Sequence, residues 1–223
     1  MGATVVIVGR NPAKCTAVVN EIKRISGNDA VEALVADLSI MAEVRQVAEQ
    51  FKAKYRQLHV LVNNAGAAFG QRQVTAEGFE KTFALNHLSC FLLTTLLLDT
   101  LKASAPARIV TVSSDAHKSA HLDFDDLQSE QGGFVFNAYG RSKLANVVFS
   151  YELARRLSGT GVTANVLHPG LVRTGFAGNL GAIPSAAIDF LMRFVGMTPE
   201  QGAKTSVYLA TSAAVTPAAL RLN

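Results

Sequence analysis

The chain has 223 residues, of which 49% are hydrophobic and 17% are charged, and its formal net charge is +4. This length suits one domain with a substantial core, and the composition excludes an intrinsically disordered chain. The 21 Lys and Arg residues are dispersed, so we expect no nucleic-acid partner. Two cysteines, Cys15 and Cys90, make no disulfide framework and match no metal-ligand spacing, which favours reduced thiols in the cytoplasm and no metal site.

The longest apolar stretch begins at Phe91 and is broken by Asp99, so it is shorter than the roughly 20 residues that a membrane span needs. No basic segment followed by an apolar core, the pattern of a secretory signal, is present in the sequence. We therefore expect no transmembrane segment. We interpret the stretch as a buried helix that could also face a second subunit of a homo-oligomer.

Strand and helix patterns alternate along the chain. The apolar run at 5–8 predicts a strand, and Asn11-Pro12 then indicates the N-cap and first residue of a helix that continues to about residue 25. Further strands are predicted at 31–36, 59–62, 107–112 and 162–167, and further helices at about 41–55, 77–103 and 137–158. This alternation predicts an α/β fold with a Rossmann-like, doubly wound parallel sheet, in a single domain over residues 1–223.

Two irregular regions interrupt the alternation, at 115–136 and at about 173–198. The second has the apolar character of a mobile substrate lid. An ordinary pair of surface helices explains it equally well.

The most informative motif is Tyr139-Gly-Arg-Ser-Lys143, at the start of an apolar-periodic segment. Four residues span just over one helical turn, so on a helix the phenol and the ammonium share a face. A free tyrosine has a pKa of about 10, and an adjacent cation favours the phenolate, which lowers that pKa and permits proton transfer near neutral pH. Such a pair also arises by chance in amphipathic helices, so it needs support from other segments.

Polar and small residues at the ends of predicted strands supply that support. In a doubly wound sheet these strand ends build the ligand crevice. A further amide, Asn86, falls inside the helical pattern at 77–103. The strand-end residues are Asn63-Asn64-Ala65-Gly66, Ser113-Ser114 and Pro169-Gly170.

These five segments, in this order, resemble those of a short-chain dehydrogenase/reductase. The flank from Ala138 to Asn146, and the spacing of 25 residues from Ser114 to Tyr139, are most similar to the retinol-dehydrogenase-like branch. The resemblance covers about residues 2–214. It implies a nicotinamide-dependent oxidoreductase that acts on a small apolar alcohol or carbonyl compound.

The resemblance also implies a role for each candidate catalytic residue. Tyr139 would donate or accept the proton during hydride transfer, and Lys143 would lower the pKa of Tyr139 and bind the nicotinamide ribose. Ser114 would orient the substrate oxygen. The family's register selects it over Ser113, because strand alternation points the two to opposite sides. Asn86 would hold a water in the proton relay, the alternative being a structural amide.

Cofactor contacts follow from the same resemblance. Asp37 would accept a hydrogen bond from adenine while Leu38 packs against the ring, although an Asp after a strand is also a common turn residue. The remaining positions would approach the adenosine ribose or the nicotinamide side. They are Asn64, Ala65 and Gly66, then Tyr139 and Lys143, then Pro169, Gly170, Val172 and Thr174.

Gly9-Arg10 follows the strand at 5–8, where a carboxylate would bind the ribose hydroxyls of NAD. Here no anion opposes a 2′-phosphate, a guanidinium is available to bind it, and Lys14 follows one turn into the helix. The sequence therefore favours NADP(H) over NAD(H). An exposed Arg10 without a cofactor role is the alternative.

Two departures from the family leave three interpretations open. No glycine-rich turn precedes any strand, and the segment at 5–8 matches the family's second strand. The tail after Val215 lacks a final strand pattern. The preferred interpretation is a truncated enzyme whose Met1 is internal. The others are a non-catalytic binding or interaction module, and a fragment that borrows a strand from a partner. Without the first strand, we expect unpaired edges in the middle of the sheet.

Overall fold

The computed structural model describes residues 2–131, 135–172 and 196–215. All three strand pairings are parallel, and the predicted α/β fold is confirmed. That residues 1–223 form one domain stays a prediction. In chain order the elements are β1 (Val5–Gly9), α1 (Pro12–Ser26), β2 (Val31–Val35), α2 (Met41–Lys54), β3 (Val60–Asn63), α3 (Lys81–Phe83), η1 (Ala84–Leu88), α4 (Ser89–Ala103), β4 (Ala107–Val112), η2 (Asp115–Ser119), α5 (Val135–Arg156), β5 (Val162–Leu167) and α7 (Pro199–Thr211).

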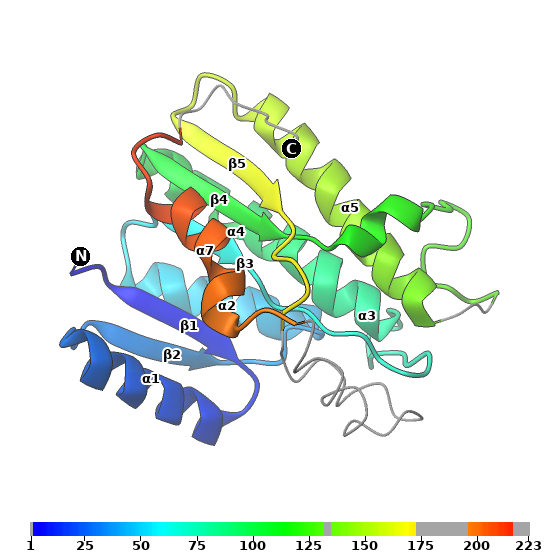
Figure 1. The fold of residues 1–223 in the computed structure, drawn as a ribbon, viewed down its shortest axis with the longest axis horizontal. Coiled ribbons are helices and arrows are strands. Elements are labelled where there is room, and N and C mark those ends of the chain that lie inside the picture. The colour runs from blue at the N-terminus through cyan, green and yellow to red at the C-terminus, as the bar shows by residue number, and fades with distance from the viewer. Residues whose placement is uncertain (1, 132–134, 173–195, 216–223) are drawn as a thin grey trace.

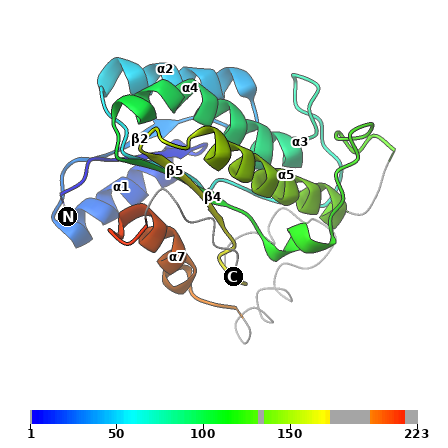
Figure 2. The same ribbon diagram turned by 90° about the horizontal axis from the view of Figure 1, so that it is seen from above.

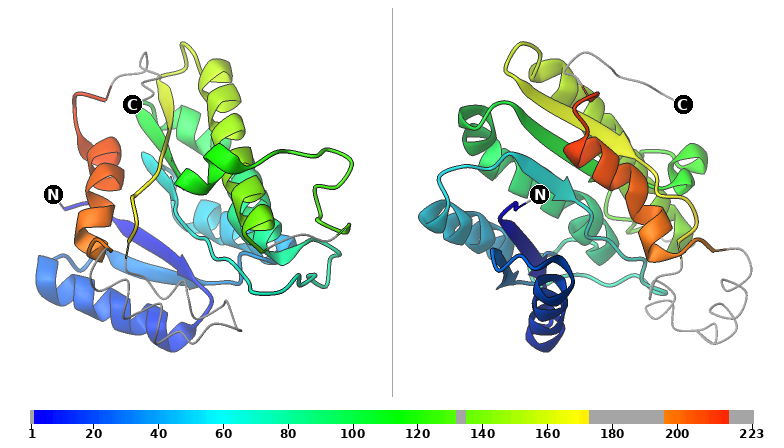
Figure 3. Two further views of the ribbon diagram at one scale, coloured as in Figure 1. Left: turned by 45° about the vertical axis from the view of Figure 1, so that its right-hand side comes forward. Right: turned by 60° about the vertical axis from the view of Figure 1, so that its left-hand side comes forward.

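Helices cover both faces of the strands. Figure 2 shows α2, α4 and α5 on one side and α1 and α7 on the other. On the first side, Leu101 of α4 and Leu153 of α5 pack against Ile109 and Val162 of the sheet. On the second side, α7 lies beside β4 and β5 (Figure 3), and Arg108 donates from Nη1 to the carbonyl of Leu209 at 3.2 Å. The arrangement is the doubly wound one predicted from the alternation of elements.

Strand pairing is interrupted in the middle of the fold. β1 pairs with β2, and β3 pairs with β4, which pairs with β5. The strands of both groups run in the same direction (Figure 1). Within the described ranges, however, no strand bonds to the edge of β1 that faces away from β2, or to the edge of β3 that faces away from β4. Both groups share one helix layer, because Val6 and Leu61 pack against the same apolar cluster on α2 and α4. This matches the unpaired edges expected without the family's first strand.

Helix ends explain why the elements begin where they do. The Asn11 Oδ1 atom accepts the Lys14 N–H at 3.0 Å, with Pro12 as first helical residue, as predicted. α2 has no such cap at Ile40, and a distant carboxylate replaces it. Glu77 accepts the Met41 N–H at 2.6 Å and the Ala42 N–H at 2.9 Å. This contact fixes the loop after β3 against α2.

The helix from Lys81 to Ala103 is continuous, and its second turn, η1, is a π-helical segment. Single π-turns inside helices occur frequently at functional sites. By length and composition this helix could cross a membrane, although 44% of its apolar window is buried in the protein. Core helices of water-soluble proteins have the same properties, so this is weak evidence for a span.

Candidate active site

Tyr139 and Lys143 share one face of α5, as their spacing predicted. The Lys143 side chain is buried, with 4% of the residue exposed, and its Nζ donates to the carbonyl of Val112, the last residue of β4, at 3.0 Å. The same Nζ lies 5.6 Å from the centroid of the Tyr139 ring. An ammonium has three donor hydrogens, and Val112 is its one hydrogen-bond acceptor among the residues described. Within the part of the chain that the structure describes, Lys143 therefore has donor hydrogens without an acceptor at the end of the sheet.

Ser114 lies beside the phenol, whereas Ser113 does not. The Ser114 and Tyr139 side chains are hydrogen-bonded, and the Ser114 Oγ also accepts the Ala116 N–H at 3.3 Å. Ser113 is buried and donates from Oγ to the carbonyl of Lys143 at 2.8 Å. The two hydroxyls thus have different partners: Ser113 bonds to the backbone of α5, and Ser114 bonds to the Tyr139 side chain.

Burial sets the proton affinities of the pair. Burial raises the pKa of Tyr139, and the hydrogen bond with Ser114 opposes that rise only in part. Burial also lowers the pKa of Lys143 from 10.5 to about 8. A lowered Tyr139 pKa was expected from the sequence, and in this structure that expectation is wrong, because burial of the phenol raises its pKa more than the Ser114 hydrogen bond lowers it. The phenol is thus protonated at neutral pH and suited to donating its proton.

Asn86 lies in the π-helical turn and is 1% exposed. Its Oδ1 accepts the Ala67 N–H at 2.8 Å, and its Nδ2 donates to the Ala67 carbonyl at 3.0 Å and to the Ser142 Oγ at 2.9 Å. The amide side chain therefore joins the loop after β3 to α5. This geometry supports the structural-amide alternative, and the water-relay role stays a prediction.

Two glycines allow the elements of the site to approach closely. A Cβ on Gly66 would lie 3.1 Å from the Asn86 Oδ1 and 3.2 Å from the Lys143 Nζ. A Cβ on Gly140 would lie 2.9 Å from the carbonyl oxygen of Ala116. The strand end at Asn64-Ala65-Gly66 and the segment after Ser114 are therefore both held against the Tyr139–Lys143 face of α5.

Asp37 and Leu38 follow β2, as predicted. Burial alone would raise the pKa of Asp37, but hydrogen bonds from Ser39 and the charges of Arg10 and Lys81 outweigh it and lower that pKa. Asp37 is thus an anion whose Oδ1 accepts both the N–H and the hydroxyl of Ser39. Leu38 packs against the α2–α4 cluster. Arg10 is exposed at the end of β1.

The predicted nicotinamide side follows β5. Gly170 has a positive φ of 80°, a conformation that favours glycine, and its N–H donates to the His168 Nδ1 at 3.2 Å. Val172 forms a parallel bridge with Met197, so the chain ends that flank the expected lid meet. Thr174, and residues 173–195 of the lid expected at about 173–198, lie outside the described residues.

Three further buried side chains contribute to the site and were not predicted from the sequence. Asn146 donates from Nδ2 to the Asn86 carbonyl at 2.9 Å, and its Oδ1 lies 3.0 Å from the His87 Nδ1. Ser142 donates from Oγ to the Tyr139 carbonyl at 2.7 Å. Glu80, 1% exposed, caps the helix that carries Asn86. The available signal was helical spacing, since Ser142 and Asn146 lie three and seven residues after Tyr139.

Within the described residues, no group of three or more His, Cys, Asp or Glu side chains could hold a metal ion. The absence of a metal from the function stays a prediction. The chemistry available at the site is that of a phenol, a hydroxyl and a buried amine.

Comparison with known proteins identifies the family. Residues 1–183 match the family model described as short chain dehydrogenase. The chain belongs to the short-chain dehydrogenase family. Human polyprenol dehydrogenase is 46% identical over 97% of this chain and 66% of its own length, and human retinol dehydrogenase 12 is 43% identical over 97% and 68%. The chain thus spans about two thirds of the length of these relatives.

Solved structures of the family share the fold. A short-chain dehydrogenase/reductase of unknown function from Caenorhabditis elegans, solved with cofactor, aligns with a TM-score of 0.74 and 27% identity, over 94% of this chain and 79% of that one. The RhlG/NADP active-site complex of Pseudomonas aeruginosa aligns with a TM-score of 0.69 and 30% identity, over 97% and 83%. The retinol-dehydrogenase-like resemblance inferred from the sequence is therefore confirmed at the level of family and fold.

Proposed function

We propose that the chain carries the catalytic half of an oxidoreductase that transfers hydride between NADP(H) and an apolar alcohol or carbonyl compound. The observation that carries this proposal is the meeting of Ser114, Tyr139 and Lys143 at the carboxyl end of β4. The bound cofactor would supply or accept the hydride. Relatives named retinol and polyprenol dehydrogenases support an apolar alcohol or carbonyl as the substrate class.

Each residue contributes a separate step. Tyr139 is protonated at neutral pH, and burial raises its pKa further, so in the direction of reduction it would give its proton to a carbonyl oxygen. Ser114 can donate and accept hydrogen bonds at once, so it orients that oxygen beside the phenol. Lys143 has donors to spare for ribose hydroxyls, and its positive charge favours the phenolate that remains after proton transfer.

The preference for NADP(H) rests on Arg10. This guanidinium is exposed at the end of β1, near enough to Asp37 for its charge to lower the pKa of that carboxyl. Position 9 is a glycine, so the chain has no carboxylate there that would repel a 2′-phosphate. The NADP-bound relative from Pseudomonas aeruginosa supports a nicotinamide cofactor of this kind.

A second candidate function is a non-catalytic binding or interaction module. The observation that favours it is the interruption between β1 and β3, together with the lack of a glycine-rich turn before any strand of the sequence. Backbone amides of such a turn receive the cofactor pyrophosphate at a helix N-terminus. The residues expected to bind the adenosine end and the nicotinamide end of the cofactor are present. Among the described residues, however, no turn of backbone amides is available for the pyrophosphate between them.

A direct assay separates the two functions. The 223-residue chain, and a version extended upstream by a strand and glycine-rich turn, are mixed with NADPH and an apolar aldehyde, and the decrease in NADPH absorbance is followed. Turnover by the extended version supports the oxidoreductase. Binding of aldehyde or NADPH without turnover by either version favours the module.

A cytoplasmic location and a homo-oligomeric state also belong to the proposal. Cell fractionation tests the first, and it bears on the apolar helix Lys81–Ala103, because a protein held by that helix would sediment with membranes. Light scattering at several protein concentrations tests the second.

A further inference from the structure

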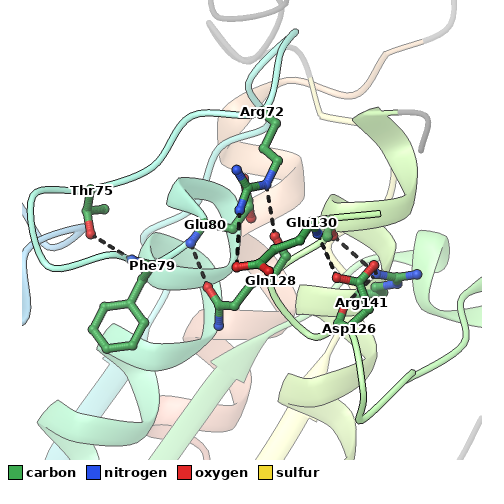
Figure 4. A network of polar contacts seen from close by, with 9 residues as sticks. Arg72, Thr75, Phe79, Glu80, Asp126, Gln128, Glu130 and Arg141 are labelled. Atoms are coloured by element: carbon green, nitrogen blue, oxygen red, sulfur yellow. Dashed lines mark hydrogen bonds and ion pairs between the residues drawn. The ribbon is translucent and has the colours of Figure 1, made fainter. Parts of the chain in front are cut away.

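A loop at 123–130, here called the bridging loop, bonds to both helices that carry candidate catalytic residues (Figure 4). One of these helices begins at Lys81 and contains Asn86. The other is α5, which contains Tyr139 and Lys143. None of the loop's own residues belongs to the proposed catalytic set.

At the first helix, the loop is attached through Glu80. The Glu80 Oε1 accepts the Thr82 N–H at 2.9 Å, and its Oε2 accepts the Phe83 N–H at 2.7 Å, so this buried carboxylate caps the helix. The Glu80 N–H in turn donates to the Gln128 Oε1 at 2.7 Å. The start of the Asn86 helix is thus fixed to the bridging loop.

At α5, the loop is attached through Arg141, which lies between Tyr139 and Lys143 in the chain. The Arg141 Nη1 donates to the Asp126 carbonyl at 2.9 Å and to the Ser129 Oγ at 3.2 Å, and it lies 3.7 Å from the Asp126 Oδ2. The Asp126 side chain is 5% exposed and that of Arg141 18%, so solvent screens this pair less than a surface ion pair.

The loop between the two attachments is internally braced. The Asp126 Oδ1 accepts the Glu130 N–H at 2.6 Å, and the Ser129 backbone takes a left-handed conformation with φ 52°. Arg72, in the segment after β3, donates from Nε to the Gln128 carbonyl at 3.1 Å and so adds a further contact to the loop. A braced loop transmits a displacement from one attachment to the other.

We propose that the bridging loop is a tie that sets the position of Asn86 relative to Tyr139 and Lys143, with Glu80, Gln128 and Arg141 as positioning residues. The inference rests on the proposed function for its catalytic meaning. The tie itself is a property of the 223-residue chain and is testable without turnover.

Hydrogen–deuterium exchange tests the tie. Gln128→Leu removes the acceptor of the Glu80 N–H at similar volume, and Arg141→Ala removes the opposite attachment. Gln128→Leu should speed exchange about tenfold in peptides covering 81–88 and also across the loop, in 139–146, relative to α1. Arg141→Ala should likewise speed exchange in the peptide covering 64–72, because the Ala67 N–H donates to the Asn86 Oδ1 there. Effects confined to each variant's own attachment would overturn the proposal.

The matched control is Arg155→Ala, which breaks an exposed ion pair with Glu152 on the same helix and should change neither region. In an NADPH-binding extended version, Gln128→Leu should lower kcat about tenfold while the Kd for NADPH stays within about twofold. Unchanged kcat despite coupled exchange would overturn the positioning role. If the extended version turns over no carbonyl at all, the proposed function fails, and exchange still decides the tie.

Discussion

The Lys143 ammonium lies 5.6 Å from the centre of the Tyr139 ring, yet its hydrogen bond runs to the carbonyl of Val112 at 3.0 Å. The lysine is thus anchored to the end of β4, and the phenol is paired with Ser114 instead. The Lys143 ammonium lies close enough to the Tyr139 ring for a cation–π contact. Because Tyr139 and Lys143 bond to different partners, the contribution of each residue can be tested by a separate substitution.

Tyr139→Phe, in a version extended by the first strand and glycine-rich turn, should abolish turnover and leave NADPH affinity within about twofold. The ring keeps its packing, while the dissociable proton and the Ser114 contact are lost. Stopped-flow reduction of an apolar aldehyde and NADPH fluorescence titration measure the two quantities. Ser113→Ala is the matched control, because that hydroxyl bonds only to the Lys143 carbonyl in the described structure. Full activity of Tyr139→Phe would show that Tyr139 does not transfer the proton in the reaction.

Lys143→Met should stabilise the 223-residue chain in a pH-dependent way. Burial lowers the pKa of Lys143 to about 8, below its unfolded value of 10.5, so the protonated lysine favours the unfolded state and stability rises with pH between these values. The variant should gain about 1–3 kcal/mol at pH 7, where the cost of the buried charge is partly offset by the Val112 bond. The gain should shrink towards pH 10.

Urea denaturation at pH 7 and pH 10 measures this gain. Lys102→Met, at an exposed lysine near the end of α4, is the control and should show no such pH dependence. An equal gain for Lys143→Met at both pH values would mean that the ammonium is not destabilising in the folded chain.

Arg10→Ala should weaken NADPH binding to the extended version roughly ten- to hundredfold and leave NADH binding nearly unchanged. A charge-assisted hydrogen bond to the 2′-phosphate contributes about 1.5–3 kcal/mol, and NADH has no such phosphate. Parallel fluorescence titrations with the two cofactors give the ratio. Arg24→Ala, an exposed charge near the far end of α1, is the control. Equal losses for both cofactors would show that Arg10 does not bind the 2′-phosphate.

The 223-residue chain should bind NADPH far more weakly than the extended version. The pyrophosphate carries two charges, and its expected partners are amides of a turn that the sequence lacks. The added strand should also pair with the free edges of β1 and β3, so the extended version should unfold at higher urea. Fluorescence titration and urea denaturation of the two proteins measure both effects. Micromolar NADPH binding by the 223-residue chain would contradict this account.

The sequence predicted the elements well, because each strand is a short apolar run between turn residues. Asn11-Pro12 correctly marked the start of α1, and strand alternation separated Ser113 from Ser114. α7 was not predicted, although the capping box of Thr198 and Gln201 marks its start. The approach of Asn86 to Ser142, 56 residues later, depends on packing that no local pattern encodes.

The predicted lowering of the Tyr139 pKa was wrong for a related reason. Spacing showed that a cation would share the helix face, but it carried no information on burial, and burial has the larger effect on this phenol. The bridging loop was likewise not predicted, since Glu80 and Gln128 lie 48 residues apart and Gln128 belongs to an irregular segment. Local pattern predicts which elements form, and polar contacts between loops require the assembled fold.

Gly9 affects how easily mutation could change the cofactor preference of this chain from NADP(H) to NAD(H). A Cβ at this position would lie 2.7 Å from the Cys15 Sγ, closer than real contacts of this kind. The carboxylate that would turn the chain towards NAD therefore cannot be introduced by Gly9→Asp alone without displacing the thiol. The Cys15 side chain would have to move to admit a carboxylate at position 9, so residue 15 also influences how readily the cofactor preference can be changed.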